Sequence, residues 1–431
     1  MKKAALHNLG CKVNAYETEA MQQILENAGY EIVPFTEIAD VYVINTCSVT
    51  NMADRKSRQM FHRAKKMNPD AIVVGAGCYV QTKEAQALVD ESIDIVIGNN
   101  QKHELVTLLN EYEKEHTKQA QIVDINHEKQ EYEELHLKKT AEHTRAFIKV
   151  QDGCNQFCSY CIIPYARGRV RSRAKEDVVA EVTDLAKNGY QEVVLTGIHL
   201  SSYGIDFENE DNLLSLIRAV HEIEGIKRIR LGSLEPRIIT EEFVQAIAAL
   251  PKMCPHFHLS LQSGCNETLK RMNRRYTSEE FYEKCEILRK YFEKPALTTD
   301  VIVGFPQETE EEFETTYEFL KKICFYETHI FKYSKREGTK AAVMQGQIPE
   351  QIKAKRSARL IELGEKNRRA YEESFLGKTV EVLVEEKSDV NGKEMWTGHT
   401  KEYMKIALES EKNLQNCILN VQIKDGREII H

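Results

Sequence analysis

The first hundred residues alternate short apolar runs with segments whose apolar residues recur at helical spacing. Between the first two runs, Met21, Ile24 and Leu25 fall on one face of a helix that Gly29 is suited to end. Short apolar runs that alternate with helices predict a parallel α/β sheet. The apolar runs occupy residues 2–10, 40–47, 71–78 and 93–98. We therefore expect an N-terminal α/β domain over residues 1–110.

The next stretch is polar. Residues 101–145 contain no Gly or Pro and are rich in Glu, Lys, Gln and His. Residues 103–115 have a helical pattern, while the rest has the composition of a linker. We expect a polar linker over residues 111–139.

The alternation of strands and helices resumes at residue 146. Six strand-like runs occupy residues 146–152, 192–197, 228–233, 256–262, 297–305 and 327–334. Helical patterns follow them at residues 176–187, 211–223, 240–249, 278–292, 309–322 and 349–373. Strand–helix units in such a series predict a partial (β/α)6 barrel over residues 140–374, with its chemistry at the carboxyl ends of the strands.

The tail of the chain changes character again. Its strand-like runs are separated by turns, and no clear helical pattern accompanies them. This pattern predicts a small antiparallel β-barrel over residues 375–431. The runs occupy residues 377–389, 394–400, 403–410 and 417–430.

Composition indicates a soluble, folded protein. The chain has 431 residues, of which 42% are apolar and 29% charged, and no apolar run approaches the ~18 residues that span a bilayer. The basic start, residues 1–14, lacks the long apolar stretch of a signal peptide. We therefore expect a cytoplasmic monomer without a membrane partner. Eleven cysteines are then expected to be metal ligands, catalytic thiols or core residues rather than disulfides.

Charge is uneven along the chain. The net charge of −8 excludes a general polyanion binder, yet residues 55–66 carry six Lys/Arg and no acidic residue. Residues 353–369 carry seven Lys/Arg and two Glu. Each segment is either a solvated helix face or part of an RNA-binding surface. Residues 376–431 hold eight Lys/Arg and ten Asp/Glu, so RNA contact there would need a local face or aromatics such as Trp396 and Tyr403.

Three cysteines follow the first strand of the predicted barrel. Cys154, Cys158 and Cys161 lie in "GCNQFCSYC" with the spacing C-x3-C-x2-C. Three thiolates on a [4Fe–4S] cluster leave one iron with an open coordination position, which a small molecule can fill through amino and carboxylate groups. The alternative is a zinc knuckle whose fourth ligand lies elsewhere in the sequence.

Three further cysteines each come just after an apolar run: Cys11, Cys47 and Cys78. The carboxyl ends of parallel strands share one edge of a sheet, so these residues are expected to converge on a second three-cysteine cluster. Taken singly, each is more often a buried core thiol. The remaining cysteines show no ligand spacing and are expected to be structural: Cys254, Cys265, Cys285, Cys324 and Cys417.

With both groups present, the sequence resembles the radical S-adenosylmethionine (SAM) methylthiotransferase family over essentially the whole chain. The C-x3-C-x2-C motif after the first barrel strand is the superfamily signature, and "NLGCKVN", "VINTCSVT" and "GAGCYVQ" match the family's other cysteine group. The resemblance implies an N-terminal methylthiotransferase domain, a radical SAM domain and a C-terminal TRAM domain. It also implies two [4Fe–4S] clusters, one of which binds exchangeable SAM.

Within the family, "NLGCKVN", "CNQFCSYCIIPYARGRVRSR" and "LSLQSGCNETLKRMNRRY" most resemble the branch acting on N6-threonylcarbamoyladenosine (t6A) at position 37 of tRNA. That resemblance implies formation of the 2-methylthio derivative, in which one SAM methylates a sulfur atom and a second supplies the radical. The implied partners are a tRNA anticodon stem-loop and an electron donor such as a flavodoxin or ferredoxin.

Relatives in the same family act on isopentenyladenosine in tRNA or on an aspartate of a ribosomal protein, and both remain alternatives. An alternative of a different class is a non-catalytic, metal-containing RNA-binding protein. It would require four protein ligands at each metal site, whereas the sequence offers two groups of three.

SAM is expected to contact the ends of several barrel strands. Gly197 allows close backbone approach after the second strand, and Ser260 and Gln262 offer polar groups after the fourth. In the fifth, Asp300 is expected to bind a ribose hydroxyl and Gly304 to lie near the adenine. Ordinary barrel packing is the alternative for each.

Other charged residues also follow barrel strands. Glu235 and Arg237 either read the modified nucleotide or form a structural ion pair. The segment "RGRVRSR", residues 167–173, has arginines at alternating positions, which share one face if the segment is extended. That face would contact phosphate or the SAM carboxylate, or it would be a solvated edge strand.

Overall fold

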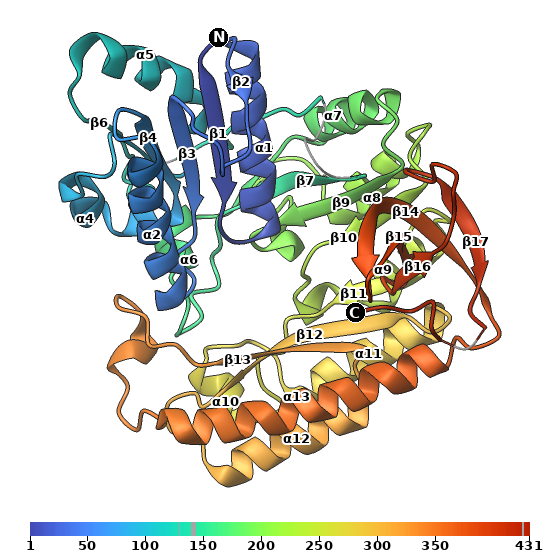
Figure 1. Ribbon diagram of the computed structural model, residues 1–431. Helices are drawn as coiled ribbons and strands as arrows, with labels where there is room; N and C mark the ends of the chain where they lie inside the picture. The colour runs from blue at the N-terminus through green and yellow to red at the C-terminus, as the bar shows by residue number, and fades with distance from the viewer. Residues whose placement is uncertain (129, 139–143, 425) are drawn as a thin grey trace.

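The structure, a computed structural model, describes residues 1–128, 130–138, 144–424 and 426–431. Three β-structures follow one another along the chain (Figure 1). The first is a parallel sheet, the second a curved wall of parallel strands, and the third an antiparallel sheet. The predicted α/β fold class is therefore confirmed.

The N-terminal sheet has the strand order β2-β1-β3-β4-β5-β6, and neighbouring strands are parallel. Successive residues of β3 bury opposite faces, with Tyr42 in one core and Val43 in the other, as expected for a sheet covered on both sides. The strands are β1 (Lys3–Asn8), β2 (Glu31–Ile32), β3 (Val41–Thr46), β4 (Ile72–Gly77), β5 (Ile95–Ile97) and β6 (Gln119–Gln121).

Helices cover both faces of this sheet. Phe61 of α2 lies in one core, and Leu109 of α5 lies in the other. The helices are α1 (Lys12–Asn27), α2 (Asn51–Met67), α3 (Cys78–Thr82), α4 (Glu84–Val89), the 3-10 turn η1 (Lys102–Glu104) and α5 (Leu105–Glu115).

The polar segment 111–139, predicted to be a linker, is largely ordered against the N-terminal sheet. It contains the end of α5, and β6 pairs with β5 as the edge strand. Further along, Leu135 and Leu137 are buried against Tyr16 and Ala20 of α1. The sheet therefore extends past residue 110.

The central unit has six parallel strands in series. In space the strands run β7-β9-β10 and then β11-β12-β13. The isolated bridges Ile229–Met253 and Leu234–Leu259 join the β10 side of the first group to the β11 side of the second. The partial (β/α)6 barrel is thus confirmed. Its strands are β7 (Arg145–Asp152), β9 (Glu192–Gly197), β10 (Arg228–Leu231), β11 (His256–His258), β12 (Ala296–Val303) and β13 (Glu327–Lys332).

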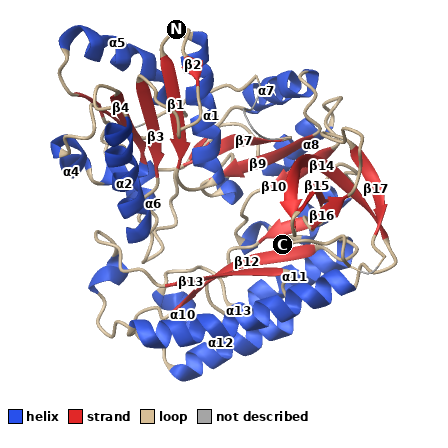
Figure 2. Ribbon diagram, in the orientation of Figure 1, coloured by secondary structure: helices blue, strands red, loops and turns tan. Residues whose placement is uncertain are grey.

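Helices line the outer face of these strands (Figure 2), and one continuous apolar core joins helices to strands. The short strand β8 (Arg171–Ser172) pairs antiparallel with the end of β7. The helices are α6 (Ile163–Arg167), α7 (Lys175–Lys187), α8 (Leu213–His221), α9 (Glu241–Ala248), α10 (Asn266–Arg271), α11 (Ser278–Tyr291), α12 (Glu310–Ile323) and α13 (Glu350–Glu373). The 3-10 turns are η2 (Leu200–Ser202), η3 (Pro236–Ile238) and η4 (Lys340–Val343).

The C-terminal unit is an antiparallel sheet in the order β16-β15-β14-β17, as the sequence predicted. A further bridge joins Ile406 to Ile429. Figure 1 shows the sheet curled beside the barrel. Its strands are β14 (Thr379–Val390), β15 (Lys393–Thr400), β16 (Lys405–Leu408) and β17 (Ile418–Gln422).

Two aromatics expected to offer RNA contact pack against other residues: Trp396 is buried and Tyr403 is partly buried. Trp396 is 7% exposed, in the core of the C-terminal sheet. The ring of Tyr403 stacks on His256 at 4.9 Å, and the guanidinium of Arg230 lies 4.9 Å from its centroid. Tyr403 therefore fastens the C-terminal sheet to the amino-terminal end of the barrel. Among the described residues, no helix has the length and apolarity needed to cross a membrane.

Candidate active site

The N-terminal sheet brings Cys11, Cys47 and Cys78 to one edge. Asn8 of β1 pairs with Asn45 of β3, and Thr46 pairs with Gly77 of β4. Because the strands are parallel and in register, the residues that follow them emerge together. Cys11 precedes α1, Cys47 follows β3 directly, and Cys78 is the first residue of α3.

Gly10 lets two of these loops approach closely. Its φ is +126°, and a Cβ there would lie 3.1 Å from the Cβ and 3.3 Å from the Sγ of Cys47. Asn14 ties the same loops together, because its Nδ2 donates to Leu9 O at 2.8 Å and to Thr46 O at 2.9 Å. Any larger residue at position 10 would push Cys47 away from Cys11.

The loop after β7 carries Cys154, Cys158 and Cys161. Gly153 has φ +70°, and a Cβ there would lie 1.8 Å from the carbonyl oxygen of Arg169, so only glycine fits. Backbone bonds fold the loop on itself: Cys154 N–H donates to Gly168 O, and Cys161 N–H donates to Cys158 O, both at 3.0 Å.

Burial disfavours the thiolate form of several of these cysteines, and it raises the pKa of Cys11 above its usual value. It raises the pKa of Cys47 and of Cys154 to about 11, and that of Cys161 to about 12. Metal ligation requires the thiolate, so iron binding would displace these protons.

The two cysteine groups lie on either side of one helix contact. α3, which begins at Cys78, packs against α6, which starts at Ile163 just after Cys161. Asn99 spans this contact: its Nδ2 lies 3.5 Å from Cys78 Sγ and donates to Ala166 O at 2.8 Å. The two cysteine groups thus lie close to the junction of the N-terminal sheet and the barrel.

A buried ionic network, formed by Glu17, Lys102, Lys149, Asp152 and Arg167, lies at the same junction. Glu17 is on α1, downstream of Cys11, and Lys149 and Asp152 are on β7, upstream of Cys154. The Nζ of Lys149 is 2.8 Å from Glu17 Oε1 and 2.7 Å from Asp152 Oδ2. The network therefore joins α1, which follows Cys11, to β7, which precedes Cys154.

Two glycines expected to approach SAM also lack room for a side chain, and their approach to SAM stays a prediction. A Cβ on Gly197 would lie 2.8 Å from Gln151 Oε1, and one on Gly304 would lie 2.3 Å from Lys353 Cγ. Gly304 also has φ +70° and donates its N–H to Glu308. Neighbouring side chains thus fill the space that each glycine leaves.

The polar residues expected to contact SAM lie on or beside the barrel wall. Asp300 Oδ2 is 3.3 Å from His258 Nε2, and ligand atoms of Asp300, His258 and His329 lie within 4.8 Å of one another. Gln262 adopts φ +71°, a strained conformation for a residue with a side chain. The carbonyl oxygen of Ser260 accepts from Arg274 Nη2 at 2.8 Å. These residues remain candidates for ligand contact.

Two family descriptions match this chain. Residues 148–320 match the Radical SAM superfamily, and residues 3–98 match Uncharacterized protein family UPF0004. Threonylcarbamoyladenosine tRNA methylthiotransferase MtaB of Bacillus subtilis (strain 168) is 42% identical over 424 residues, covering 98% of this chain and 94% of that protein. The MtaB of Aquifex aeolicus (strain VF5) is 44% identical, covering 90% of this chain and 93% of that protein.

The chain belongs to the radical SAM methylthiotransferase family. The tRNA-2-methylthio-N(6)-dimethylallyladenosine synthase of Finegoldia magna is 35% identical, covering 96% of this chain and 90% of that protein. Among solved structures, the radical SAM methyltransferase TsrM of Kitasatospora setae has a TM-score of 0.58 at 16% identity, covering 79% of this chain and 74% of that chain. That likeness concerns the fold alone.

Membership in the radical SAM methylthiotransferase family implies SAM and two [4Fe–4S] clusters. The donor chemistry fits, because each of the two cysteine groups offers three thiols and thiolates are the ligands of iron–sulfur clusters. A positive charge also lies beside the loop that follows β7, where Arg274 Nη1 is 3.3 Å from Cys158 Sγ. Such a charge stabilises an anionic thiolate–iron centre.

The arginines at 167–173 do not form one exposed face. Arg167 ends α6 and is fully buried, with Nη1 2.8 Å from Glu17 Oε1. Arg171 and Arg173 are also buried, and Arg173 bonds Glu181. The prediction of a shared phosphate-binding face is wrong, because a helix and carboxylate partners on distant elements intervene. Arg169 remains exposed.

Glu235 and Arg237 form the ion pair that was one of the two expectations, with Arg237 Nε 3.0 Å from Glu235 Oε1. Arg237 is 47% exposed, whereas Glu235 is 7% exposed. Among the cysteines without ligand spacing, Cys254, Cys265 and Cys285 are buried. Cys324 is exposed after α12, and Cys417 is partly exposed.

The two basic segments differ in their environment. In α2, Arg55, Lys56 and Arg63 are exposed. In α13, Arg356 is buried with Nη1 3.0 Å from Glu308 Oε2, and Arg359 Nη2 bonds Glu314. Arg359 and Glu314 are partly exposed, and Lys355, Lys366 and Arg369 of α13 are exposed, so both helices present positive charge on the surface.

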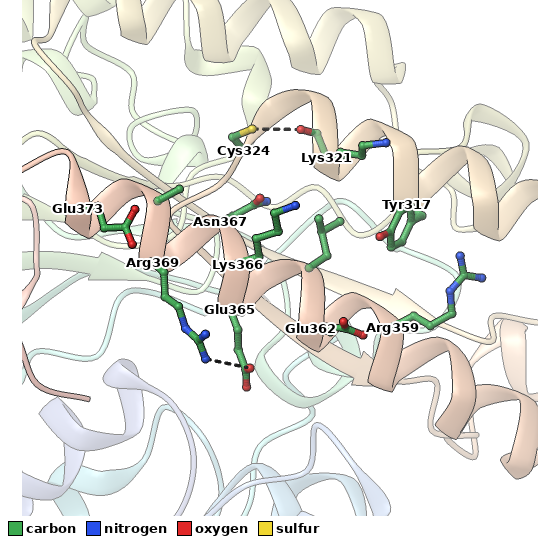
Figure 3. A pocket seen from close by; sticks show the side chains of 12 residues that line it. Tyr317, Lys321, Cys324, Arg359, Glu362, Glu365, Lys366, Asn367, Arg369 and Glu373 are labelled. Atoms are coloured by element: carbon green, nitrogen blue, oxygen red, sulfur yellow. Dashed lines mark hydrogen bonds and ion pairs between the residues drawn. The ribbon is translucent and has the colours of Figure 1, made fainter.

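A hollow between α12 and α13 lies on the outer side of the barrel (Figure 3). Tyr317, Cys324 and Arg359 are among the residues that line it, and none of the six cysteines of the two groups does. It is separate from the junction that carries these groups.

Arg274, His258, His329 and Asn99 were missed in the sequence. Each contacts a partner that is distant in the chain, as Arg274 contacts Cys158. The segment "MNRRY" around Arg274 carries no spacing that distinguishes it from an ordinary basic turn. His258 lies in β11 and His329 in β13, and only the observed strand register places them beside Asp300.

Proposed function

We propose that this radical SAM methylthiotransferase converts t6A at position 37 of tRNA to its 2-methylthio derivative. The observation that carries the proposal is the pairing of two three-cysteine groups at one junction, in a chain 42% identical over 98% of its length to a t6A tRNA methylthiotransferase. An electron donor such as a flavodoxin or ferredoxin would supply reducing equivalents.

Each cysteine group has a proposed role. Cys154, Cys158 and Cys161 would hold the cluster that binds SAM, and Cys11, Cys47 and Cys78 would hold the auxiliary cluster. When bound, these groups supply a carbon radical and a sulfur atom for an unactivated C–H bond, which side-chain acids and bases cannot break. The chain would supply position and charge: Arg274 beside Cys158, and Asn14 and Asn99 beside the auxiliary loops.

The polar residues of the barrel wall would orient SAM and the nucleotide. We assign Ser260, Gln262 and Asp300 to SAM contact, and assign Gly197 and Gly304 to packing beneath the bound molecule. Arg237 is half exposed at a strand end, where it can meet the carboxylate of the threonylcarbamoyl group.

RNA would bind across α2. Its exposed Arg55, Lys56 and Arg63 lie on the helix that starts just after the Cys47 loop, so phosphate contacts there would place the anticodon loop beside the junction. Affinity should then fall as salt concentration rises.

The domain arrangement follows the sheets. We propose a methylthiotransferase domain that includes β6 (Gln119–Gln121), a short connection ending near residue 139, a radical SAM domain over residues 140–374 and a TRAM domain over residues 375–431. We also propose that the protein acts as a cytoplasmic monomer.

Relatives at 35–36% identity are named tRNA-2-methylthio-N(6)-dimethylallyladenosine synthases, so isopentenyladenosine is the second candidate substrate. The test is an anaerobic competition assay in which anticodon stem-loops carrying t6A or isopentenyladenosine are mixed and the products resolved by mass spectrometry. Methylthiolation of the t6A loop is expected. Preference for the isopentenyl loop, or turnover of a ribosomal protein instead, would overturn the substrate assignment.

A further inference from the structure

The loop that follows β13 touches both cysteine-bearing loops. It spans residues 334–341 and is called the bridging loop below. The side chain of Arg336 contacts Asp54 of the N-terminal domain. The backbone amide of Ala341 contacts the loop that carries Cys154, Cys158 and Cys161.

At its first end, Arg336 is inserted beside the Cys47 loop. Its Nη1 is 2.5 Å from Asp54 Oδ2, its Nη2 is 3.1 Å from Asp54 Oδ1, and Nη2 also donates to Ser48, the residue after Cys47. The side chains of Arg336 and Asp54 are 3% and 8% exposed. Asn51 adds a bond from its Nδ2 to the carbonyl oxygen of Lys335 at 2.9 Å.

The same contact reaches the third auxiliary cysteine. Ser48 Oγ lies 3.0 Å from Thr82 Oγ1, and that hydroxyl donates to the carbonyl oxygen of Cys78 at 2.9 Å. Arg336 therefore fixes the positions of the loops that carry Cys47 and Cys78 through one set of buried bonds.

At its other end, the bridging loop holds the radical SAM cysteine loop. Ala341 N–H donates at 2.8 Å to the carbonyl oxygen of Ser159, which lies between Cys158 and Cys161. Ala341 also lies in a small apolar core with Tyr160 packed against it. A short, ordered stretch of backbone thus connects the two cysteine groups.

We infer that Arg336 is a positioning residue that sets the distance between the auxiliary cysteine group and the SAM-binding cysteine group. The inference rests on the proposed two-cluster function. The reaction needs a radical carbon and a sulfur atom to reach the same substrate carbon, and a misplacement of about 1 Å can cost on the order of 10²-fold in rate.

A predicted separation of two activities follows. Cleavage of SAM needs only Cys154, Cys158 and Cys161, whereas methylthio transfer needs both groups in register. Arg336→Gln should keep the iron content and the 5′-deoxyadenosine yield within about twofold, while the ratio of methylthiolated RNA to 5′-deoxyadenosine falls by roughly 10- to 100-fold.

The experiment uses full-length protein, reconstituted without oxygen. It compares wild type, Arg336→Gln, Arg336→Lys and the charge reversal Asp54→Arg with Arg336→Asp. The control is Arg228→Gln, which breaks an equally buried pair with Glu192 beneath the C-terminal sheet. We expect the ratio to fall in Arg336→Gln, to recover in part in Arg336→Lys and the reversal, and to stay unchanged in the control.

Electron paramagnetic resonance supplies a readout independent of turnover. With both clusters reduced, their mutual spin–spin interaction depends on their separation, so it should change in Arg336→Gln and stay as in wild type in Arg228→Gln. An unchanged spectrum and an unchanged product ratio would overturn the inference. Equal loss of SAM cleavage and product would also overturn it, because that result indicates general damage to the barrel mouth.

A second variant covers the case in which Arg336→Gln fails to fold. One glycine inserted between Gly338 and Thr339 keeps the Arg336 and Ala341 contacts but lengthens the backbone between them. We expect the same fall in product ratio, and a wild-type ratio would refute the positioning role. Failure of the proposed function is distinguishable, since wild type itself would then bind fewer than two clusters or leave t6A RNA unmodified.

Discussion

Replacement of Glu17 by glutamine should destabilise the protein far more than an ordinary loss of an ion pair. Glu17 Oε1 accepts from Lys149 Nζ and Arg167 Nη1, both at 2.8 Å, and its Oε2 is 3.2 Å from Lys102 Nζ. The carboxylate is 0% exposed, as is the Arg167 side chain. Glutamine keeps the shape but removes the charge, so Lys102 would lose its ion pair, and Lys149 and Arg167 would keep only the pair with Asp152.

The size of the effect follows from this burial. Removing one partner of a buried ion pair typically costs ~3–5 kcal/mol, because the remaining charge is left uncompensated. A loss of that size would lower the melting temperature by on the order of 10 °C for a unit of 150–250 residues. The matched control is Glu314→Gln, whose pair with Arg359 is 44% and 35% exposed and should contribute only ~0–1 kcal/mol.

Thermal unfolding of the full-length, metal-free protein under reducing conditions measures both variants. Glu17→Gln should unfold several degrees below Glu314→Gln, and limited proteolysis should first cut the N-terminal domain away from the barrel, because the network joins α1 to β7. Equal melting temperatures for the two variants would refute the view that this network holds the domains together.

Other predictions concern the cysteine loops and pH. Gly153→Ala should cost about half of the roughly eight irons expected for two clusters, because its Cβ would lie 1.8 Å from Arg169 O; full iron content would contradict the loop geometry. Cys158→Ala should abolish SAM cleavage, whereas Cys47→Ala should spare cleavage and stop methylthio transfer; a normal 5′-deoxyadenosine yield from Cys158→Ala would contradict those roles. Burial raises the pKa of Asp152, but the nearby cations hold it well below its usual range. The contribution of this carboxylate to the free energy of unfolding should therefore be complete above pH ~5 and fall progressively below pH ~4, as urea titrations can measure. A free energy of unfolding that does not change in acid would argue against it.

The sequence predicted the features that depend on local pattern. Cys11, Cys47 and Cys78 each end an apolar run, and parallel strands necessarily bring such positions to one edge. The edge strand β6 was missed because its residues, Gln119–Gln121, offer only the small Ala120 between two glutamines to indicate a strand. Edge strands with little burial give weak signals.

Contacts between distant residues could not be predicted in this way. Arg336 and Asp54 are 282 positions apart, and neither stands out in its own segment. The alternating arginines suggested an extended strand, but Ile163–Arg167 forms a helix and Arg167 finds Glu17 across 150 positions. The partners of Tyr403 were likewise not predictable, since its ring stacks on His256, 147 positions earlier. Tertiary partners, rather than local spacing, decide the environment of each.

Mass spectrometry of tRNA nucleosides from a strain that lacks this protein tests the central claim most directly. The proposed function predicts that 2-methylthio-t6A disappears, that t6A accumulates in its place, and that wild type but not Cys47→Ala restores the methylthio group. Unchanged 2-methylthio-t6A, with loss of a methylthio group from isopentenyladenosine or from a ribosomal protein, would contradict it.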